Sequence, residues 1–137
     1  MRPYAPTRLA RPLAALAVAA LLQAGCAGTH NVARDLTVTN QPDSFEMHVG
    51  ELVNFTHRFT YDWPTTGTKA TVRQASNFTN GVALLEIKDP TGLVVHSKNL
   101  REVGSFITFE GKPGVWKIKV TLEEATGNLT FLVQKNG

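Results

Sequence analysis

The stretch LVNFTHRFTYDW, residues 52–63, alternates between apolar and polar side chains over most of its length. The positions of one parity are Val53, Phe55, His57, Phe59, Tyr61 and Trp63. The positions between them carry asparagine, threonine, arginine and aspartate. Because successive side chains of a strand point to opposite faces, this pattern predicts a long strand with one face in a core and one face in water.

Shorter runs of the same kind continue on both sides of this stretch. They occupy residues 36–40, 44–49, 69–74, 82–89, 93–99, 105–110, 115–122 and 128–134. Between two of them, DPTG at 89–92 has the Asp, Pro and Gly spacing of a type I turn. The pattern predicts an all-β fold, an antiparallel β-sandwich of eight or nine short strands, Ig-like or jelly-roll. The single cysteine excludes an internal disulfide.

The formal net charge of +3 belongs to the start of the chain. Arg2, Arg8 and Arg11 all precede the first acidic residue, Asp35. Removing these three arginines from the fourteen basic residues leaves eleven, which balance the eleven acidic residues. The body of the protein is therefore neutral, and this argues against nucleic acid as a partner.

An apolar run of ten residues, 13–22, follows those arginines. A membrane-spanning helix needs roughly 20 apolar residues, whereas the apolar region of an export signal has about 7–15. The positive start and the short apolar run therefore predict a cleaved export signal rather than a transmembrane anchor. The only cysteine, Cys26, lies just beyond this run.

The sequence LLQAGC at 21–26 resembles the lipobox of bacterial lipoproteins, in which small residues precede a modified cysteine. Ala24 and Gly25 match the small positions, while Gln23 departs from the apolar residue that is usual there. The resemblance implies cleavage between Gly25 and Cys26 and acyl chains, such as palmitate, on Cys26. An ordinary secretory signal cut near Ala24 or Ala27 remains the alternative. Two or three acyl chains hold a domain at a bilayer, whereas one chain does so only marginally.

This interpretation divides the chain into three parts and predicts where in the cell the protein lies. Residues 1–25 are the cleaved signal, residues 26–34 are the lipidated cysteine and a polar tether, and residues 35–137 are the β-sandwich domain. We expect the protein to lie in the bacterial cell envelope, anchored by lipid and facing outward from the cytoplasmic side. Ala27 follows the cysteine, which in lipoproteins of bacteria with two membranes resembles the pattern for the outer membrane.

Residues 82–134 are similar to small bacterial sandwich domains of the pre-peptidase and Golgi-dynamics kinds. The resemblance is carried by turn and core positions. These are Asp89, Pro90, Gly92, Pro113, Gly114, Trp116, Ile118, Val120, Ala125 and Gly127. Domains of these kinds serve as accessory, binding or interaction modules. The resemblance therefore implies a fold and an interaction role without catalytic residues.

The residues offer little for catalysis or for metal binding. The serines lack the G-x-S-x-G context, and no H-x-H or H-E-x-x-H spacing occurs. His57 falls on the apolar face of its stretch, where it is either a core or rim histidine or a group with a shifted pKa. His96 falls on the opposite phase of its own run. We therefore predict that the protein is not an enzyme, has no cofactor and holds no metal.

Two aromatic residues provide a candidate ligand platform. Tyr61 and Trp63 end the alternating stretch beside Pro64, where Trp63 is either exposed to a ligand or packed at the edge of the core. The sequence thus favours a membrane-anchored module that binds or scaffolds another envelope protein. The alternative is a module that binds carbohydrate or peptidoglycan through Tyr61 and Trp63.

Overall fold

The computed structural model describes residues 31–136, and this part of the chain is all-β and antiparallel. It contains seven strands and no helix. The strands are β2 (Val32–Gln41), β3 (Ser44–Thr65), β4 (Ala70–Gln74), β5 (Asn77–Lys88), β6 (Val94–Asn99), β7 (Gly104–Ile107) and β8 (Gly114–Lys135). β2 begins inside the segment predicted as a tether, because residues 32–34 pair with residues 51–53 of β3.

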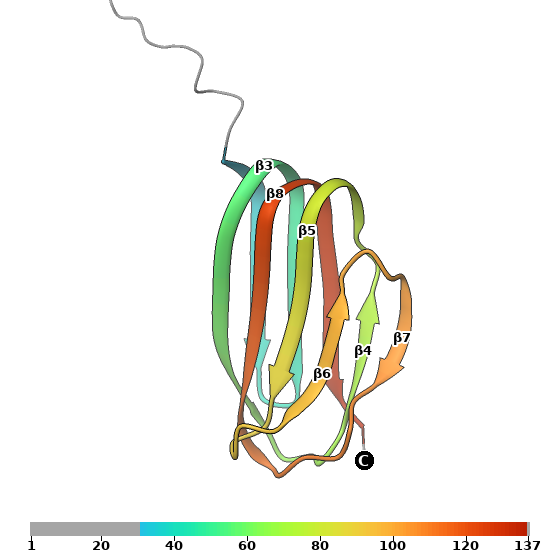
Figure 1. The fold of residues 1–137 in the computed structure, drawn as a ribbon. Helices are drawn as coiled ribbons and strands as arrows, with labels where there is room; N and C mark the ends of the chain where they lie inside the picture. Colours follow the sequence, from blue (N-terminus) through green and yellow to red (C-terminus); the bar gives the residue numbers. More distant parts are fainter. Residues whose placement is uncertain (1–30, 137) are drawn as a thin grey trace, which may run out of the picture. The chain divides into compact units, whose positions relative to one another are not determined.

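The two longest strands, β3 and β8, pair with each other from end to end. Each has 22 residues, and their register runs from Ser44 opposite Gln134 to Thr65 opposite Gly114. The register shifts three times between Val49 and His57. Figure 1 shows both strands bending over at this place, so that each has two limbs. We call residues 44–49 and 57–65 the first and second limbs of β3.

The structure differs here from the expected eight or nine short strands. Residues 44–49 and 52–63 are one strand, as are residues 115–122 and 128–134, because the β3–β8 ladder resumes beyond the gap between the two predicted runs. The bends use residues with left-handed backbone, among them Asn54 (φ 46°) and Glu124 (φ 48°). A left-handed residue can redirect a strand without ending it.

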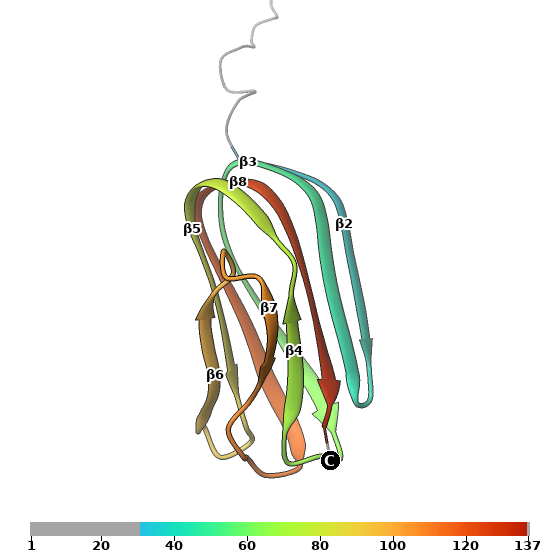
Figure 2. The ribbon, with the colours of Figure 1, turned by 90° about the vertical axis from the view of Figure 1, so that its right-hand side faces the viewer.

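All seven strands belong to one hydrogen-bonded sheet. The order is β2-β3-β8-β4-β7, and β5 pairs with β8 and carries β6 on its other edge. Figure 2 shows β5 and β6 on one side of the doubled sheet, with β4 and β2 on the other. The bend of β3 and β8 therefore turns one face of the sheet toward itself.

The side chains between the two halves form the core, and their alternation confirms the apolar faces predicted for residues 44–49, 115–122 and 128–134. In residues 52–63 the predicted inward face is buried only at Trp63, while Phe59 and Tyr61 are partly buried and His57 is exposed. Trp116, Ile118, Val120 and Leu122 of β8 are buried, as are Phe45, Met47 and Val49 of β3. The rings of Phe45 and Tyr61, one from each limb of β3, have centroids 5.2 Å apart. Trp63 and Trp116 meet edge to face at 5.8 Å. Edge-to-face packing suits the ring quadrupoles.

The predicted turn at 89–92 is confirmed by the hydrogen bond from Gly92 N to Asp89 O at 3.0 Å. The Asp89 carboxylate accepts from the hydroxyl and the amide of Thr91 (2.6 and 2.9 Å), from Leu93 N, and from Lys112 N of a second loop. The Thr91 hydroxyl first, and then the backbone amides, lower the pKa of Asp89 against the opposing effect of burial. The ionised carboxylate of Asp89 therefore links its own turn to the loop that contains Lys112.

The bend of β8 depends on Gly127. Its φ is +141°, and a Cβ placed there would lie 2.1 Å from Asn77 O of β5. Gly92 also has positive φ (+91°), but a Cβ there meets nothing within 4 Å. We predict that Gly127→Ala lowers the free energy of unfolding by at least about 3 kcal/mol, because the new Cβ would clash with the β5 backbone and the backbone conformation at this position would also be strained. Gly92→Ala should cost only about 1 kcal/mol.

Urea unfolding followed by tryptophan fluorescence measures both values. Equal losses in the two variants would show that the close contact between β5 and the bend of β8 does not matter.

Candidate functional site

The residues predicted to form sites differ in where they lie in the structure. Gly25 and Cys26, together with the rest of the predicted signal, lie outside the described residues. Trp63 is fully buried against Trp116, and its Nε1 donates to Gln41 O at 3.0 Å. The prediction of an exposed platform at Trp63 is therefore wrong, because Trp63 shares the inward phase of β3 and the β2–β3 turn meets it. Tyr61 is only partly buried.

Tyr61 ends a row of rings along β3. Phe55, His57, Phe59 and Tyr61 occupy alternate positions, so their side chains share one face. Phe59 and Tyr61 are nearly parallel (6°) with centroids 6.3 Å apart. His57 is exposed, and its ring lies edge-on to Phe59 at 4.6 Å. Burial raises the pKa of the Tyr61 hydroxyl.

This row lies at a border of the sheet. The second limb of β3 pairs with β8 on one edge, and within residues 31–136 no strand pairs with its other edge. β2 is the neighbouring border, because it pairs with β3 alone in the described chain. Two strand edges therefore stand beside the aromatic row.

β2 presents apolar side chains toward the same side. Leu36 and Val38 lie opposite the buried residues Val49 and Met47, so they share the core face of the sheet. Nevertheless they are 45% and 36% exposed. We call Leu36, Val38, His57, Phe59 and Tyr61 the open flank. Partly exposed apolar residues next to free backbone groups are suited to contact with another chain.

Hydrogen bonds tie β2 to β3 at both ends of the open flank. Near one end, Asn40 Nδ2 donates to Asp62 O at 2.8 Å. Near the other, Asn31 N donates to Asn54 O at 3.2 Å and Thr56 N donates to Asn31 Oδ1 at 3.3 Å. The flank thus has fixed ends, and its central residues are held in place without a strand covering them.

Over residues 36–41 the free edge of β2 lacks the devices that normally prevent strand pairing, although Arg34 and the left-handed Asp35 (φ 58°) precede this part and Pro42 follows it. Charged residues, prolines and bulges usually protect an edge strand. Residues 36–41, LTVTNQ, contain no charge and no proline. They pair with β3 in unbroken register, Leu36 opposite Val49 through Gln41 opposite Ser44. This edge can therefore accept another strand.

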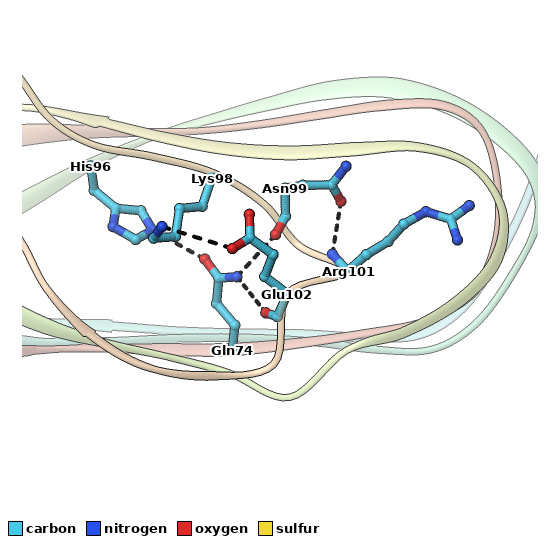
Figure 3. A network of polar contacts seen from close by, with 6 residues as sticks. All are labelled: Gln74, His96, Lys98, Asn99, Arg101 and Glu102. Atoms are coloured by element: carbon cyan, nitrogen blue, oxygen red, sulfur yellow. Dashed lines mark hydrogen bonds and ion pairs between the residues drawn. The ribbon is translucent and has the colours of Figure 1, made fainter.

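A second polar site surrounds His96, which the sequence pattern did not identify. His96 is only 5% exposed, and its Nε2 lies 3.0 Å from Gln74 Oε1 (Figure 3). The Gln74 amide nitrogen donates to Asn99 O and Glu102 O at 3.1 and 2.7 Å. Because Gln74 Oε1 must then accept, Nε2 carries the imidazole proton. The side chains link β4 and β6 to the turn after β6.

The register explains why His96 was missed. β5 and β6 shift register between Ile87 and Lys88, and His96 lies opposite the buried residue Ile87. A bulge of this kind changes which side chains point inward, and the local sequence does not indicate it. Burial lowers the pKa of His96 to about 4; the Lys98 ammonium adds to this, and the Glu102 carboxylate opposes it.

A cleft of about 630 Å³ lies beside His96 between β6 and β7. The Lys98 ammonium stands 4.7 Å from the centre of the Phe106 ring at this cleft. Ile107 and Phe109 line it as well and are largely exposed. In residues 31–136 no three His, Cys, Asp or Glu side chains gather as a metal site would require. The same part of the chain has no helix able to cross a membrane.

No protein-family model matches this chain, and a search of the curated proteins found no match. The features of this chain that bear on its function are therefore the open flank and the sequence before residue 31.

His96 should make stability depend on pH in a defined window. Its pKa is about 4 when folded and about 6.5 when unfolded, so between these values the unfolded chain binds more protons. Stability is then complete above about pH 6.5, falls as the pH drops, and levels off below about pH 4. We expect this histidine to account for on the order of 2 kcal/mol of that loss.

His96→Gln should flatten the profile of unfolding free energy over this window, because the titrating group is removed. His57→Gln is the matched control and should keep the slope of the parent. Urea unfolding at pH 4, 5, 6 and 7 gives the comparison. A slope that survives in His96→Gln would mean that other groups cause it.

Proposed function

We propose that this chain is a lipid-anchored protein of the bacterial cell envelope, held through Cys26, whose domain binds another protein through the open flank. The anchor is supported by the lipobox resemblance at 21–26 and by the three arginines before the apolar run. The domain follows closely, because β2 begins at Val32. In bacteria with two membranes, Ala27 favours the outer membrane.

We propose further that the domain is a β-sandwich of the Ig-like or jelly-roll kind. Two facts support this: β3 and β8 bend back on themselves, and Phe45 of the first limb contacts Tyr61 of the second. β5 and β6 extend one half of the doubled sheet, and β2, β4 and β7 extend the other. Such a module carries its function at its edges and loops.

The observation that carries protein binding is the edge of β2 with Leu36 and Val38 beside it. Covering a Leu or Val side chain fully contributes about 1.5–3 kcal/mol, so covering these half-exposed ones contributes roughly half as much. A strand added to β2 would also pair its free backbone groups. A strand of a partner protein can pair with the β2 edge and also cover Leu36 and Val38. Because these features serve binding rather than chemistry, we propose a non-catalytic role.

Glycan binding is the weaker proposal. Trp63, the larger of its two predicted residues, is buried in the core. Tyr61 remains partly exposed in a row otherwise formed by phenylalanine and histidine. Phenylalanine has no polar group to orient a sugar, whereas apolar side chains of a protein partner need none.

The lipid anchor predicts the mass of the mature protein. Expressed in a bacterium, the chain should begin at Cys26 and carry a diacylglyceryl group, which intact mass spectrometry of the purified protein detects. Cys26→Ser should remove the lipid and release the protein from the membrane fraction. An unlipidated parent chain cut near Ala24 or Ala27 would replace this proposal by ordinary secretion.

Protein binding predicts contacts at the flank in the cell. A photo-crosslinking amino acid at Thr37 of β2 should give one discrete protein adduct, whose second component is identified by mass spectrometry. Adding Leu36→Lys should reduce this adduct, because a lysine ammonium replaces the apolar contact. The same crosslinker at Lys119, on the outer face of β8, is the control. Equal adducts at both positions, or an adduct insensitive to Leu36→Lys, would contradict binding at the flank.

A further inference from the structure

We infer that the protein bound at the open flank is a second copy of this chain, paired antiparallel along β2. The inference rests on the proposed role of the flank as a protein-binding surface and names its partner. It follows from the order of side chains along β2, in which one register pairs both Leu36 and Val38 with apolar side chains of the second copy.

Antiparallel pairing about a two-fold axis at Thr37 brings like surfaces together. In this register Leu36 faces Val38 of the second copy, and Val38 faces Leu36. Thr37 faces its own counterpart, and Thr39 lies opposite Asp35, whose left-handed backbone (φ 58°) marks the end of the regular ladder. Directly opposed residues share a face, so the apolar pairs gather on the core side of β2. No like charges oppose each other over residues 35–39.

Neighbouring registers lack this match. An axis at Leu36 places Val38 opposite Arg34, and an axis at Val38 places Leu36 opposite Asn40. Each keeps one apolar pair, Leu36 with Leu36 or Val38 with Val38, and places the other apolar side chain against a polar one. Because a shift of register changes every cross-strand pair, Thr37 is the only centre that covers Leu36 and Val38 with apolar surface.

The same symmetry places the two flanks together. A two-fold axis perpendicular to the sheet leaves the core face of β2 on the same side in both copies. Leu36 and Val38 of the two chains then form one apolar cluster, which lies beside the Phe59 and Tyr61 rows of both copies. The aromatic rows of the two copies flank this apolar cluster, one on each side. The backbone groups of the two β2 edges form hydrogen bonds with each other.

The expected dimer is weak and reversible. A ladder of five or six residues is smaller than the roughly 800 Å² per partner that stable complexes bury. We therefore expect a dissociation constant on the order of 100 μM, which confinement at a membrane would overcome.

Disulfide trapping tests the register directly. In the full chain carrying Cys26→Ser, Thr37→Cys places two cysteines directly opposite each other, within the 4.4–6.8 Å Cα separation that a disulfide requires. Thr39→Cys is the matched control, since its two copies are displaced by four residues, about 13 Å. Under mild oxidation at about 100 μM, Thr37→Cys should give several-fold more covalent dimer than Thr39→Cys.

Sedimentation of the Cys26→Ser chain between 10 μM and 1 mM, about tenfold either side of the expected dissociation constant, provides the second readout. Leu36→Lys should weaken dimerisation at least about tenfold, because it places an ammonium group against Val38 of the partner. Leu84→Lys is the control, because Leu84 on β5 is 44% exposed, as Leu36 is 45% exposed.

The inference is overturned if both cysteine variants crosslink equally, if neither does, or if Leu36→Lys and Leu84→Lys sediment alike. A monomeric chain that still gives a Leu36-dependent adduct with a different protein would overturn self-pairing and leave the proposed function standing. Absence of both the dimer and the adduct would remove the two proposals together.

Discussion

The antiparallel ladder between β3 and β8 is the interaction on which the rest of this structure depends. It runs the full length of two strands of 22 residues and bends in the middle without ending. The bend brings Phe45 against Tyr61 within one strand and leaves the Trp63–Trp116 pair inside the core. Every other strand but β6 and β7 joins the sheet through β3 or β8.

The open flank is a consequence of that bend. The first limb of β3 has β2 on its outer edge, whereas the second limb has no such neighbour in residues 31–136. Two borders of the doubled sheet are therefore adjacent, with Leu36 and Val38 on one side and Phe59 and Tyr61 on the other. The same geometry that builds the core thus creates the surface to which we assign the function.

Much of the core could be predicted from the sequence, because period-two alternation is a direct result of strand geometry. The faces of residues 44–49, 115–122 and 128–134 and the turn at 89–92 are as expected. The breaks expected at 50–51 and 123–127 are not strand ends, because left-handed residues such as Asn54 and Glu124 bend the β3–β8 ladder without ending it, and alternation within one segment does not indicate this.

The two errors in side-chain placement have a common origin. Trp63 was expected to be a possible platform because it ends an apparent strand, but the strand continues and the β2–β3 turn packs against its ring. His96 turns inward because of a register shift that depends on its partner strand β5. Both depend on contacts between distant segments, which alternation within one segment does not encode. Gly25 and Cys26 lie outside the described residues, so their roles rest on sequence resemblance.

The whole fold requires that β3 bends back on itself and places residues of its two limbs in contact. The most direct measurement is the nuclear Overhauser effect between ring protons of Phe45 and Tyr61 in the purified protein. We expect a strong cross-peak, because the ring centroids are 5.2 Å apart. A spectrum in which Phe45 contacts Phe131 and shows no cross-peak to Tyr61 would contradict it.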